Sequence, residues 1–446
     1  MIALRRGRPE DAERLAWVHA RVWQQAYAGL MPADLLDDLM RTLPRRTQRW
    51  RRQLAESPPW VACLDGREPV GFAGWLPSRD EDARPGETGE IGTIYVLQEY
   101  WRAGVGRLLM RAALTSLRES GYREATLWVL EGNRRARRFY EAGGWQADGT
   151  RKVGDLRGVS LQEVRYRIPL RHRMLCATGA LGIRHVSSIG EVLRRAALLP
   201  VDGFEFLIQR SHAGRLDEVL PPLLESGLSF PVVHLSKAVG ARLPHPVARA
   251  ELADNLRFAA ALGAGLGVLH LWDLPDSDRD LDGRLAAYAV ARELADDCGI
   301  ELGIESIPCS VGTPLRDLRA LLHRHPDATL VLDTEFLALH GELAEALETE
   351  ELWRAVRHLH VKDFGGSLTD ADGARQWRSP GEGTIDFRPV SAALVRESFR
   401  HTVSLEIGPG QTVDGPDWGR LPALLKRLGT DDWDFQPEPG KEKGSA

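Results

Sequence analysis

The sequence lacks any segment that would direct it to a membrane or hold it there. Nowhere in its 446 residues does an apolar run reach the roughly 18 residues that a spanning helix needs. The N-terminal stretch MIALRRGRPEDAERL is charged throughout and has no apolar core of the kind that a secretory signal carries. We therefore predict a cytoplasmic protein with neither a membrane span nor a secretory signal.

Cysteine is scarce, and its spacing argues against two kinds of framework. The sequence has four cysteines with no CxxC pair among them: Cys63, Cys176, Cys298 and Cys309. Disulfide scaffolds and thiolate zinc sites both need regularly spaced cysteines. We expect four ordinary thiols.

A strong net charge is also missing, since the formal value is −5. Residues 1–170 carry 28 Lys and Arg against 22 Asp and Glu, or +6, which leaves 30 against 41, or −11, for the rest. Neither value indicates a nucleic-acid or membrane partner, so we expect small-molecule substrates. A basic first part suits an anionic cofactor and an acidic second part suits a cation, but two solvated surfaces of opposite sign explain the counts equally well.

The first 170 residues read as helices, then strands, then a strand–helix–strand core. Residues 12–30 carry apolar side chains at helical spacing, and residues 60–76 form a hairpin pattern that turns at Asp65-Gly66. A β-rich run that ends near Val96 then leads through a glycine-containing turn into a long amphipathic helix. Glycines at such a turn let backbone amides close on a pyrophosphate, although two glycines before a helix are more often plain turn chemistry.

Two motifs in this part resemble the core of the GNAT acyl-CoA-dependent N-acetyltransferases. They are IYVLQEYWRAGVGRLLM and, further on, ATLWVLEGNRRARRFYEAGGW. The resemblance implies an α+β acetyltransferase domain over residues 1–170 with acetyl-CoA as cofactor. The cofactor-binding residues that it implies are Tyr95, Val96, Leu97, Arg102, Ala103, Gly104, Val105, Gly106, Arg107 and Asn133. The family usually has Gln or Arg three residues before the first glycine, where this chain has Trp101, so we expect Arg102 to supply the charge.

Acetyl transfer to an amine needs a base and an acid. The attacking amine must lose its proton to a carboxylate or a water chain, and Glu90 and Glu131 are the candidates, each with a solvated strand-end charge as its structural alternative. The resemblance implies that Tyr140 protonates the departing thiolate. Its structural alternative is a core tyrosine with its hydroxyl at the surface.

After a short basic joint near residues 170–174, eight strand-like segments alternate with helical ones over residues 175–430. The strands are LCATGAL, GFEFLI, FPVVHL, LGVLHL, ELGIES, TLVLDT, RHLHVKD and TVSLEI. Eight evenly spaced units favour a closed (β/α)8 TIM barrel over a doubly wound open sheet. The polar, Pro- and Gly-rich segment 431–446 is predicted to be a disordered tail.

Alternation along barrel strands predicts a polar centre. His358, His360 and Lys362 should point inward, with Leu359 and Val361 outward. Three carboxylates end neighbouring strands in the same way, and unit charges ~4 Å apart repel by about 4 kcal/mol at an effective dielectric of about 20. A divalent cation would remove that cost, and three oxygen donors with one imidazole suit Mn²⁺ or Mg²⁺, with Zn²⁺ and Co²⁺ as further options. For any one of these residues alone, a salt-bridged structural role is the alternative. The predicted metal ligands are Glu305, Asp333, His360 and Glu406.

The segments GIES, VLDT, HLHVKDF and SPGEGTIDFRPVSAALVRESFRHTVSLEI resemble the xylose-isomerase-like barrels of the sugar phosphate isomerase/epimerase superfamily. The resemblance implies the same metal ligands, with Glu205, His234, His270 and Lys362 facing the substrate. For either histidine alone, a buried ring bonded to backbone is the alternative. Relatives often carry histidine three residues after Asp333, where this chain has Phe336. That departure and the acidic surface argue against the multi-zinc relative endonuclease IV.

The barrel chemistry that follows is proton transfer beside a carbonyl, with Glu305 and Glu406 as the acid/base pair. Isomerase, epimerase and dehydratase chemistry all stay open at this point. We predict a bifunctional enzyme, an N-acetyltransferase joined to a metal-dependent isomerase or epimerase. The alternative from another class is that one half is a non-catalytic CoA- or ligand-binding regulatory module. A homo-oligomer is one option for its assembly.

Overall fold

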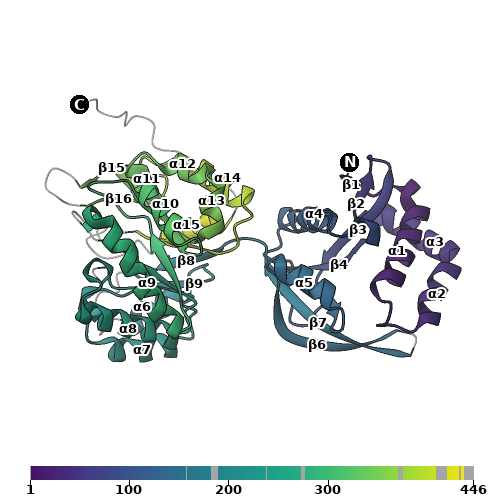
Figure 1. The fold of residues 1–446 in the computed structure, drawn as a ribbon, viewed down its shortest axis with the longest axis horizontal. Helices are drawn as coiled ribbons and strands as arrows, with labels where there is room; N and C mark the ends of the chain where they lie inside the picture. Colours follow the sequence, from purple (N-terminus) through teal and green to yellow (C-terminus); the bar gives the residue numbers. More distant parts are fainter. Residues whose placement is uncertain are drawn as a thin grey trace. The chain divides into compact units, whose positions relative to one another are not determined.

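The structure, a computed structural model, describes residues 2–156, 158–181, 189–237, 239–272, 277–369, 375–407, 419–430 and 433–435. The chain divides into two compact units, Met1–Arg171 and His172–Ala446 (Figure 1). Among the helices of the described ranges, none combines the length and the apolar character that crossing a membrane requires.

The first unit is built on a seven-stranded sheet in the order β1-β2-β3-β4-β5-β7-β6. Its strands are β1 Ile2–Arg6, β2 Trp60–Leu64, β3 Glu68–Pro77, β4 Thr88–Val96, β5 Glu124–Leu130, β6 Gln146–Leu156 and β7 Val159–Pro169. Its helices are α1 Ala12–Ala26, α2 Ala33–Arg41, α3 Leu43–Glu56, α4 Val105–Glu119 and α5 Arg134–Ala142. The predicted hairpin is β2–β3, and Asp65 and Gly66 take the positive φ angles, 47° and 70°, that a tight turn uses.

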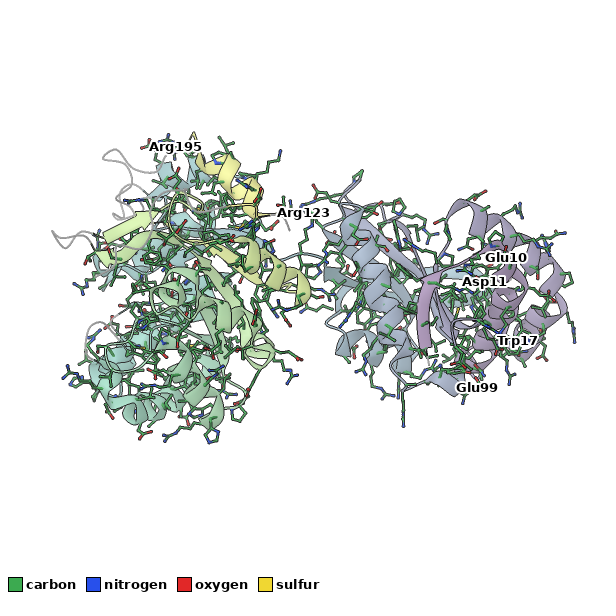
Figure 2. All side chains as sticks on the ribbon, turned by 90° about the horizontal axis from the view of Figure 1, so that it is seen from above. Glu10, Asp11, Trp17, Glu99, Arg123 and Arg195 are labelled. Carbon is green, nitrogen blue, oxygen red and sulfur yellow. The ribbon has the colours of Figure 1, made fainter. Side chains whose placement is uncertain are left out.

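Helix α1 packs on this sheet as its apolar spacing predicts. Leu15, Val18 and Val22 are almost completely buried along one face of the helix. Asp11, labelled in Figure 2, precedes α1 and accepts two hydrogen bonds of 2.6 and 2.8 Å from Arg5 on β1. This pair fixes the start of the helix against the edge of the sheet.

Strands β4 and β5 separate from each other soon after they meet. They are the one parallel pair of this sheet, and their register covers only Thr88–Glu90 of β4 against Glu124–Thr126 of β5. Beyond that point β4 stays paired with β3 as far as Val96, and β5 stays paired with β7. Backbone groups of β4 after Glu90 therefore face β5 without a strand partner there, so they can bond an extended ligand.

The second unit is a closed barrel of parallel strands in the order β10-β11-β12-β13-β14-β17-β8-β9. These strands are β8 Arg173–Ala177, β9 Gly203–Leu207, β10 Val232–His234, β11 Leu266–Leu269, β12 Glu301–Glu305, β13 Thr329–Asp333, β14 Val356–Val361 and β17 Thr402–Leu405. They coincide with the eight segments read from the sequence, so the predicted TIM barrel is confirmed.

Helices surround the barrel (Figure 1). They are α6 Ile189–Ala196, α7 Leu216–Glu225, α8 Pro246–Ala261, α9 Leu281–Asp297, α10 Pro314–Arg324, α11 Thr334–Leu339, α12 Leu343–Glu348, α13 Glu350–Ala355, α14 Arg388–Arg396 and α15 Leu421–Leu428. A small hairpin, β15 Asp363–Thr369 with β16 Arg375–Arg378, follows β14.

Alternation along the strands produces two separate apolar layers. Leu359 and Val361 belong to the large cluster that the strands share with the helices, as predicted. A small cluster fills the barrel interior and consists of Leu175, Val232, Leu266, Val268 and Val331. The polar side chains of β14 lie on that interior side, and this arrangement positions the site described below.

The chain after α15 returns to the barrel, which corrects the prediction of a disordered tail from residue 431. Trp433 and Phe435 are buried, with 1% and 6% of their surface exposed. The Trp433 ring lies 5.7 Å from the ring of His172, and the Phe435 ring lies 6.1 Å from that of Phe387. Aromatic burial outweighs the polar composition of the segment here. The other residues of the predicted tail lie outside the described ranges.

Candidate active sites

Four side chains converge at the carboxyl ends of neighbouring barrel strands. Glu305 ends β12, Asp333 ends β13, His360 lies near the end of β14 and Glu406 follows β17. One ligand atom from each lies within 4.8 Å of the others. The Nδ1 atom of His360 is 2.7 Å from Glu305, 3.5 Å from Glu406 and 3.9 Å from Asp333. The structure thus brings together the four residues named from the sequence.

Lys362 extends into the middle of this group. Its Nζ atom lies 2.6 Å from Asp333 Oδ2, 2.6 Å from Glu406 Oε2 and 3.8 Å from Glu305 Oε1. It also lies 4.6 Å from the centre of the Phe336 ring, a cation–π contact. Lys362, predicted from the resemblance to face the substrate, thus pairs its ammonium group with the carboxylates of the cluster.

Burying these charges together shifts their proton affinities. Burial raises the pKa of Asp333 to about 7, although the charge of Lys362 opposes the shift. Burial would also raise the pKa of Glu406, but Lys362 outweighs it and holds that pKa below its ordinary value. Burial opposes a charge on His360, yet the carboxylates of Glu205 and Glu305 raise the pKa of His360 well above its ordinary value.

The donor set fits a divalent cation. Asp333 Oδ1 accepts a hydrogen bond from the backbone N–H of Phe336, which leaves Oδ2 to face the centre. Asp333 Oδ2 and Glu406 Oε2 are buried and have no hydrogen-bond donor with suitable geometry within the described ranges, although each pairs with the Lys362 charge. Buried carboxylate oxygens with one imidazole nitrogen are ligands that hard divalent ions accept. Such an ion and the Lys362 ammonium would compete for the same oxygens.

The two predicted substrate histidines lie against Glu305 instead of standing free. Oε2 of Glu305 is 2.6 Å from His270 Nε2 and 3.1 Å from His234 Nε2. The other nitrogen of His234, Nδ1, bonds the backbone carbonyl of Leu235, as the structural alternative predicted. Burial lowers the pKa of His270 to about 4, partly offset by Glu305, so a neutral His270 donates its Nε2–H to the carboxylate.

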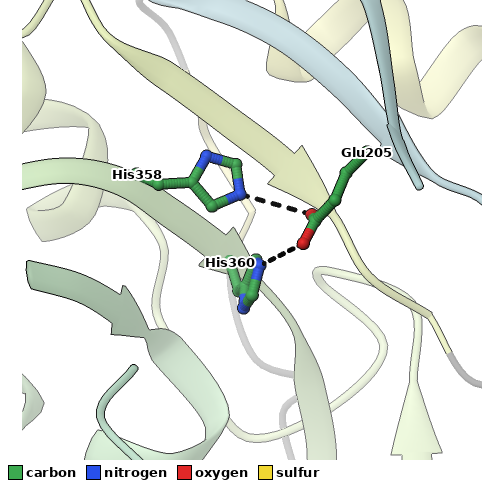
Figure 3. Close-up of side chains that lie close together, drawn as sticks. All are labelled: Glu205, His358 and His360. Carbon is green, nitrogen blue, oxygen red and sulfur yellow. Dashed lines mark hydrogen bonds and ion pairs between the residues drawn. The ribbon is translucent and has the colours of Figure 1, made fainter. Parts of the chain in front are cut away.

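Glu205, predicted from the resemblance to face the substrate, contacts two histidines of β14. It lies on β9 with 1% of its surface exposed, below the cluster just described. Its two oxygens contact His358 Nε2 at 3.3 Å and His360 Nε2 at 3.0 Å (Figure 3). Because both oxygens already have partners inside the barrel, Glu205 has no oxygen directed to the mouth.

A long loop over the barrel mouth is fixed by one carboxylate. Asp363 Oδ2 accepts hydrogen bonds from the backbone N–H groups of Gly381 and Gly383, both at 3.0 Å, and Oδ1 accepts from Ile385 at 3.2 Å. A Cβ at Gly383 would lie 2.2 Å from Asp363 Oδ1, so the loop needs glycine there. Asp363 thereby connects HLHVKDF with the segment that begins SPGEG, two of the four segments that carried the barrel resemblance.

In the first unit, a turn after β4 presents backbone amides at the start of α4. Arg102 and Gly104 both have positive φ angles, 64° and 80°, and no side chain caps the helix. The first N–H groups of such a helix have no intrahelical partner and carry partial positive charge. A Cβ at Gly106 would lie 3.3 Å from the ring of Phe139, so this glycine lets α4 pack on α5.

Trp101 carries a cation beside this turn. Its Nε1–H donates to the carbonyl of Val96 at 2.8 Å, which fixes the indole. The guanidinium carbon of Arg135, at the start of α5, lies 3.2 Å from the centre of the Trp101 ring. Arg135 makes no ion pair with a carboxylate in the described part of the chain. The departure from the usual Gln or Arg at position 101 thus comes with an arginine held on the indole.

Aromatic side chains from α1, β4 and α5 surround the end of β4. Burial raises the pKa of Tyr140, with Tyr95 adding to the shift and Arg135 opposing it. The ring of His19 stacks on Tyr95 with centroids 5.1 Å apart. Burial also lowers the pKa of His19 to about 3, so its imidazole is neutral at physiological pH.

Comparisons with known proteins identify the family of each unit. The GNAT acetyltransferase family profile matches residues 21–145, and that of the xylose isomerase-like TIM barrel matches residues 193–427, more than half of the chain. An uncharacterized N-acetyltransferase of Bacillus subtilis is 30% identical over 30% of this chain and 74% of its own length. A probable N-acetyltransferase of Mycobacterium tuberculosis is 30% identical over 37% of this chain and 93% of its own. The chain belongs to both families.

Among solved structures, the PaiA N-acetyltransferase of Thermoplasma acidophilum in complex with coenzyme A is 20% identical to this chain. It covers 37% of this chain and 98% of its own, with a TM-score of 0.29. The two resemblances read from the sequence are confirmed by the family matches.

Three residues predicted in the GNAT unit have structural partners. Glu90 is buried and pairs with Arg79 at 2.5 Å, and Glu131 pairs with Arg151 at 2.5 Å. The side-chain oxygen of Asn133 accepts from the N–H of Ala136 and caps α5. The structure therefore gives neither predicted base an unpaired carboxylate.

Sequence reasoning missed one carboxylate in the GNAT unit. Glu163 lies on β7 with a quarter of its side chain exposed, and Lys152 Nζ is 3.6 Å from it. Burial is the main cause of the raised pKa of Tyr27 and of Tyr95, and the charge of Glu163 adds the smallest contribution to each. Glu163 pairs with Leu130, the last residue of β5, and the predicted cofactor contact Asn133 follows that strand. This position opposite the end of β5 was the signal for Glu163.

Two polar residues of the xylose isomerase-like barrel, Lys237 and Thr334, were also missed. Lys237, in the loop after β10, lies 3.6 Å from Glu406 Oε1. Thr334 Oγ1 accepts from the backbone N–H of Lys362 at 2.9 Å and donates to its carbonyl at 2.7 Å. Their only signal was proximity in sequence to His234 and Asp333.

Proposed function

We propose that the chain is a bifunctional enzyme. Its GNAT unit transfers an acetyl group from acetyl-CoA to a small-molecule amine, and its barrel catalyses proton transfer beside a carbonyl of a sugar or polyol with a divalent cation bound. The observation that carries the barrel proposal is the convergence of Glu305, Asp333, His360 and Glu406 on one point. The GNAT proposal is supported by the separation of β4 from β5 beside the turn at α4.

In the barrel, Glu305, Asp333, His360 and Glu406 would hold the ion. When bound, a divalent cation polarises a substrate carbonyl and so lowers the cost of removing a proton from the neighbouring carbon. Glu406 is the better base of the predicted acid/base pair, because 12% of its side chain is exposed whereas Glu305 is fully buried against its histidines. Glu305 would hold a proton on the opposite side of the substrate or return it to the substrate carbon.

We expect purified protein to bind Mn²⁺ and to exchange a carbon-bound proton of a polyol, keto sugar or amino sugar for deuterium. Calorimetry measures the first and proton NMR in D₂O the second, and the chelator-treated protein is the control. Absence of exchange with every substrate of the panel, despite stoichiometric Mn²⁺, would contradict the isomerase or epimerase assignment and favour a dehydratase or a binding role.

Lys362 favours a second candidate for the barrel. Its ammonium already pairs with both Asp333 and Glu406, so it offsets part of the carboxylate repulsion that a bound ion would otherwise offset. A barrel of this kind would bind its ligand without metal and serve as a regulatory module. Binding of a sugar or polyol that survives complete chelation, without proton exchange, would support this candidate, and loss of binding on chelation would exclude it.

In the GNAT unit, acetyl-CoA would supply the activated acetyl group. The amides at the start of α4 would face its pyrophosphate, and the unpaired face of β4 would bond its amide arm. Tyr140 would hold the proton that the departing thiol takes. Glu163 is a better base for the amine than Glu90, because Glu90 is buried with Arg79 2.5 Å away, whereas Glu163 is a quarter exposed and its partner Lys152 lies 3.6 Å away.

Replacing Tyr140 by phenylalanine should lower kcat by about 10²-fold or more without changing the Kd for acetyl-CoA, because only the proton donor is removed. Thiol release in the presence of an amine panel measures kcat. Tyr122→Phe is the control, since Tyr122 packs on Trp75 away from the tyrosine cluster. An unchanged kcat in Tyr140→Phe would mean that Tyr140 is a core tyrosine without a catalytic role.

Replacing Arg135 by alanine should weaken acetyl-CoA binding by about 10-fold, because the guanidinium on Trp101 is a charge-assisted donor for a phosphate. Binding of S-acetylpantetheine, which has no phosphate, should be unchanged. Arg138→Ala, an exposed arginine of the same helix, is the matched control. An equal loss for both ligands would mean that Arg135 only supports the fold.

A further inference from the structure

A continuous set of contacts crosses the barrel interior below the convergent carboxylates. Thr402 Oγ1 lies 2.6 Å from His358 Nδ1, and His358 Nε2 lies 3.3 Å from Glu205 Oε2. The other oxygen of Glu205 lies 3.0 Å from His360 Nε2 (Figure 3). The glutamate and both rings have at most 1% of their surface exposed. We call Glu205, His358 and Thr402 the lower network.

The lower network restricts how His360 can be oriented. An ionised carboxylate only accepts hydrogen bonds, so each ring must present an N–H to Glu205. For His360 one donor is Nε2, and its other nitrogen, Nδ1, then faces Glu305, Asp333 and Glu406. Nδ1 can donate to Glu305 Oε1, 2.7 Å away, and would release that proton on ligating an ion. A ring turned over about its Cβ–Cγ bond would lose the bond to Glu205.

His358 keeps Glu205 itself in place. Its Nε2 uses the second carboxylate oxygen, and its Nδ1 can accept the hydroxyl proton of Thr402. The hydroxyl of Thr402, both ring nitrogens of His358 and both oxygens of Glu205 thus each have a hydrogen-bond partner. A fully bonded buried network is rigid, since any rotation leaves a polar atom unpaired in a site without water contact.

We propose that Glu205, held by His358, is a positioning residue that orients His360 so that Nδ1 serves as the cation ligand and thereby sets the affinity of the site. This inference rests on the proposed function of the barrel. Outer carboxylates bonded to metal-ligating histidines act in this way in general, and their loss typically costs about 10–100-fold in metal affinity.

The same side chains, Glu205, His358 and His360, also lie close enough to hold an ion of their own. The contacts favour hydrogen bonding instead, because each ring uses a different oxygen of Glu205. An ion there would also have to share His360 with the predicted site of Glu305, Asp333 and Glu406. A second bound ion is therefore an outcome that the experiment must separate.

The test compares the full chain with Glu205→Gln and His358→Asn, using Mn²⁺ in calorimetry and Co²⁺ in visible spectroscopy. We expect the Kd for Mn²⁺ to rise about 10–100-fold in Glu205→Gln and less in His358→Asn, with one ion per chain throughout. The Co²⁺ spectrum should change in Glu205→Gln, because the ring that ligates the ion is no longer held. His172→Asn, which removes another buried histidine whose Nε2 lies 2.9 Å from a backbone carbonyl, is the matched control and should leave both readouts unchanged.

The outcomes distinguish failure of the proposed cation site from failure of the positioning role of Glu205. A wild-type chain that binds neither ion overturns both the proposed cation site and this inference. A wild-type chain that binds one ion, with equal Kd and spectrum in Glu205→Gln, overturns the inference alone. Two ions per wild-type chain and one in Glu205→Gln would overturn it in favour of an ion in the lower network. A lower melting temperature without a changed Kd would show a structural role only.

Discussion

Replacement of Glu305 by glutamine should remove both cation binding and proton exchange from the barrel. Glu305 is the residue on which the site is built, because His234 and His270 contact one of its oxygens and His360 contacts the other. Glutamine keeps the shape but places an amide N–H₂ where one acceptor oxygen was. We expect a loss of about 10²–10⁴-fold in kcat, in the range that a general acid or base contributes.

Two measurements check this expectation for Glu305→Gln. Calorimetry should detect no Mn²⁺ binding at concentrations that saturate the wild-type chain, and proton–deuterium exchange should fall to background. Glu301→Gln is the matched control, because Glu301 begins the same strand and its carboxylate faces Thr329 and Arg357 at the amino end. Wild-type exchange in Glu305→Gln would mean that Glu305 belongs to the scaffold and not to the chemistry.

Replacement of Lys362 by methionine should have two opposite large effects. Without metal, the buried carboxylates of Asp333 and Glu406 lose the ammonium that neutralises them, and breaking a buried ion pair in this way typically costs about 3–5 kcal/mol. With metal, the competitor for the same oxygens is gone. We therefore expect Lys362→Met to bind Mn²⁺ more tightly than the wild-type chain.

The measurement is the melting temperature of Lys362→Met with and without Mn²⁺, together with the Kd. The metal-free variant should melt well below the wild type, and Mn²⁺ should raise its melting temperature by more than it raises that of the wild type. Lys237→Met is the matched control, because Lys237 is 42% exposed and lies 3.6 Å from Glu406, so its loss should matter little. A weaker Kd in Lys362→Met would mean that this lysine supports the bound ion instead of competing with it.

Much of the barrel site was predictable from periodicity. Side chains of a barrel strand alternate between interior and helices, so the neighbours of Leu359 had to point inward, and a carboxylate that ends a strand had to reach the carboxyl face. The eight strands were visible because each is short, rich in branched residues and separated by a helical pattern. The hydrophobic pattern of each segment and the closure of the eight strands into a barrel therefore indicate the same fold.

The side-chain contacts were less predictable, because they depend on side-chain reach, which periodicity does not encode. Lys362 stands one alternation beyond His360, and only its long chain lets the ammonium return to the carboxylates. Glu205 begins on β9 but is oriented by the histidines of β14, a strand that lies far away in the sequence. Similarly, the pairing of Arg135 with Trp101 joins two separate motifs, so neither motif alone could predict it.

The packing of Phe435 has a consequence for how the protein tolerates shortening. A Cβ at Gly381 would lie 3.0 Å from the Phe435 ring, so the ring lies directly against the loop that Asp363 secures over the barrel mouth. Deleting the chain after Thr430 would leave every strand and helix of the barrel intact and yet withdraw that support. Phe435 is, in this sense, part of the rim of the barrel mouth and not an appendage.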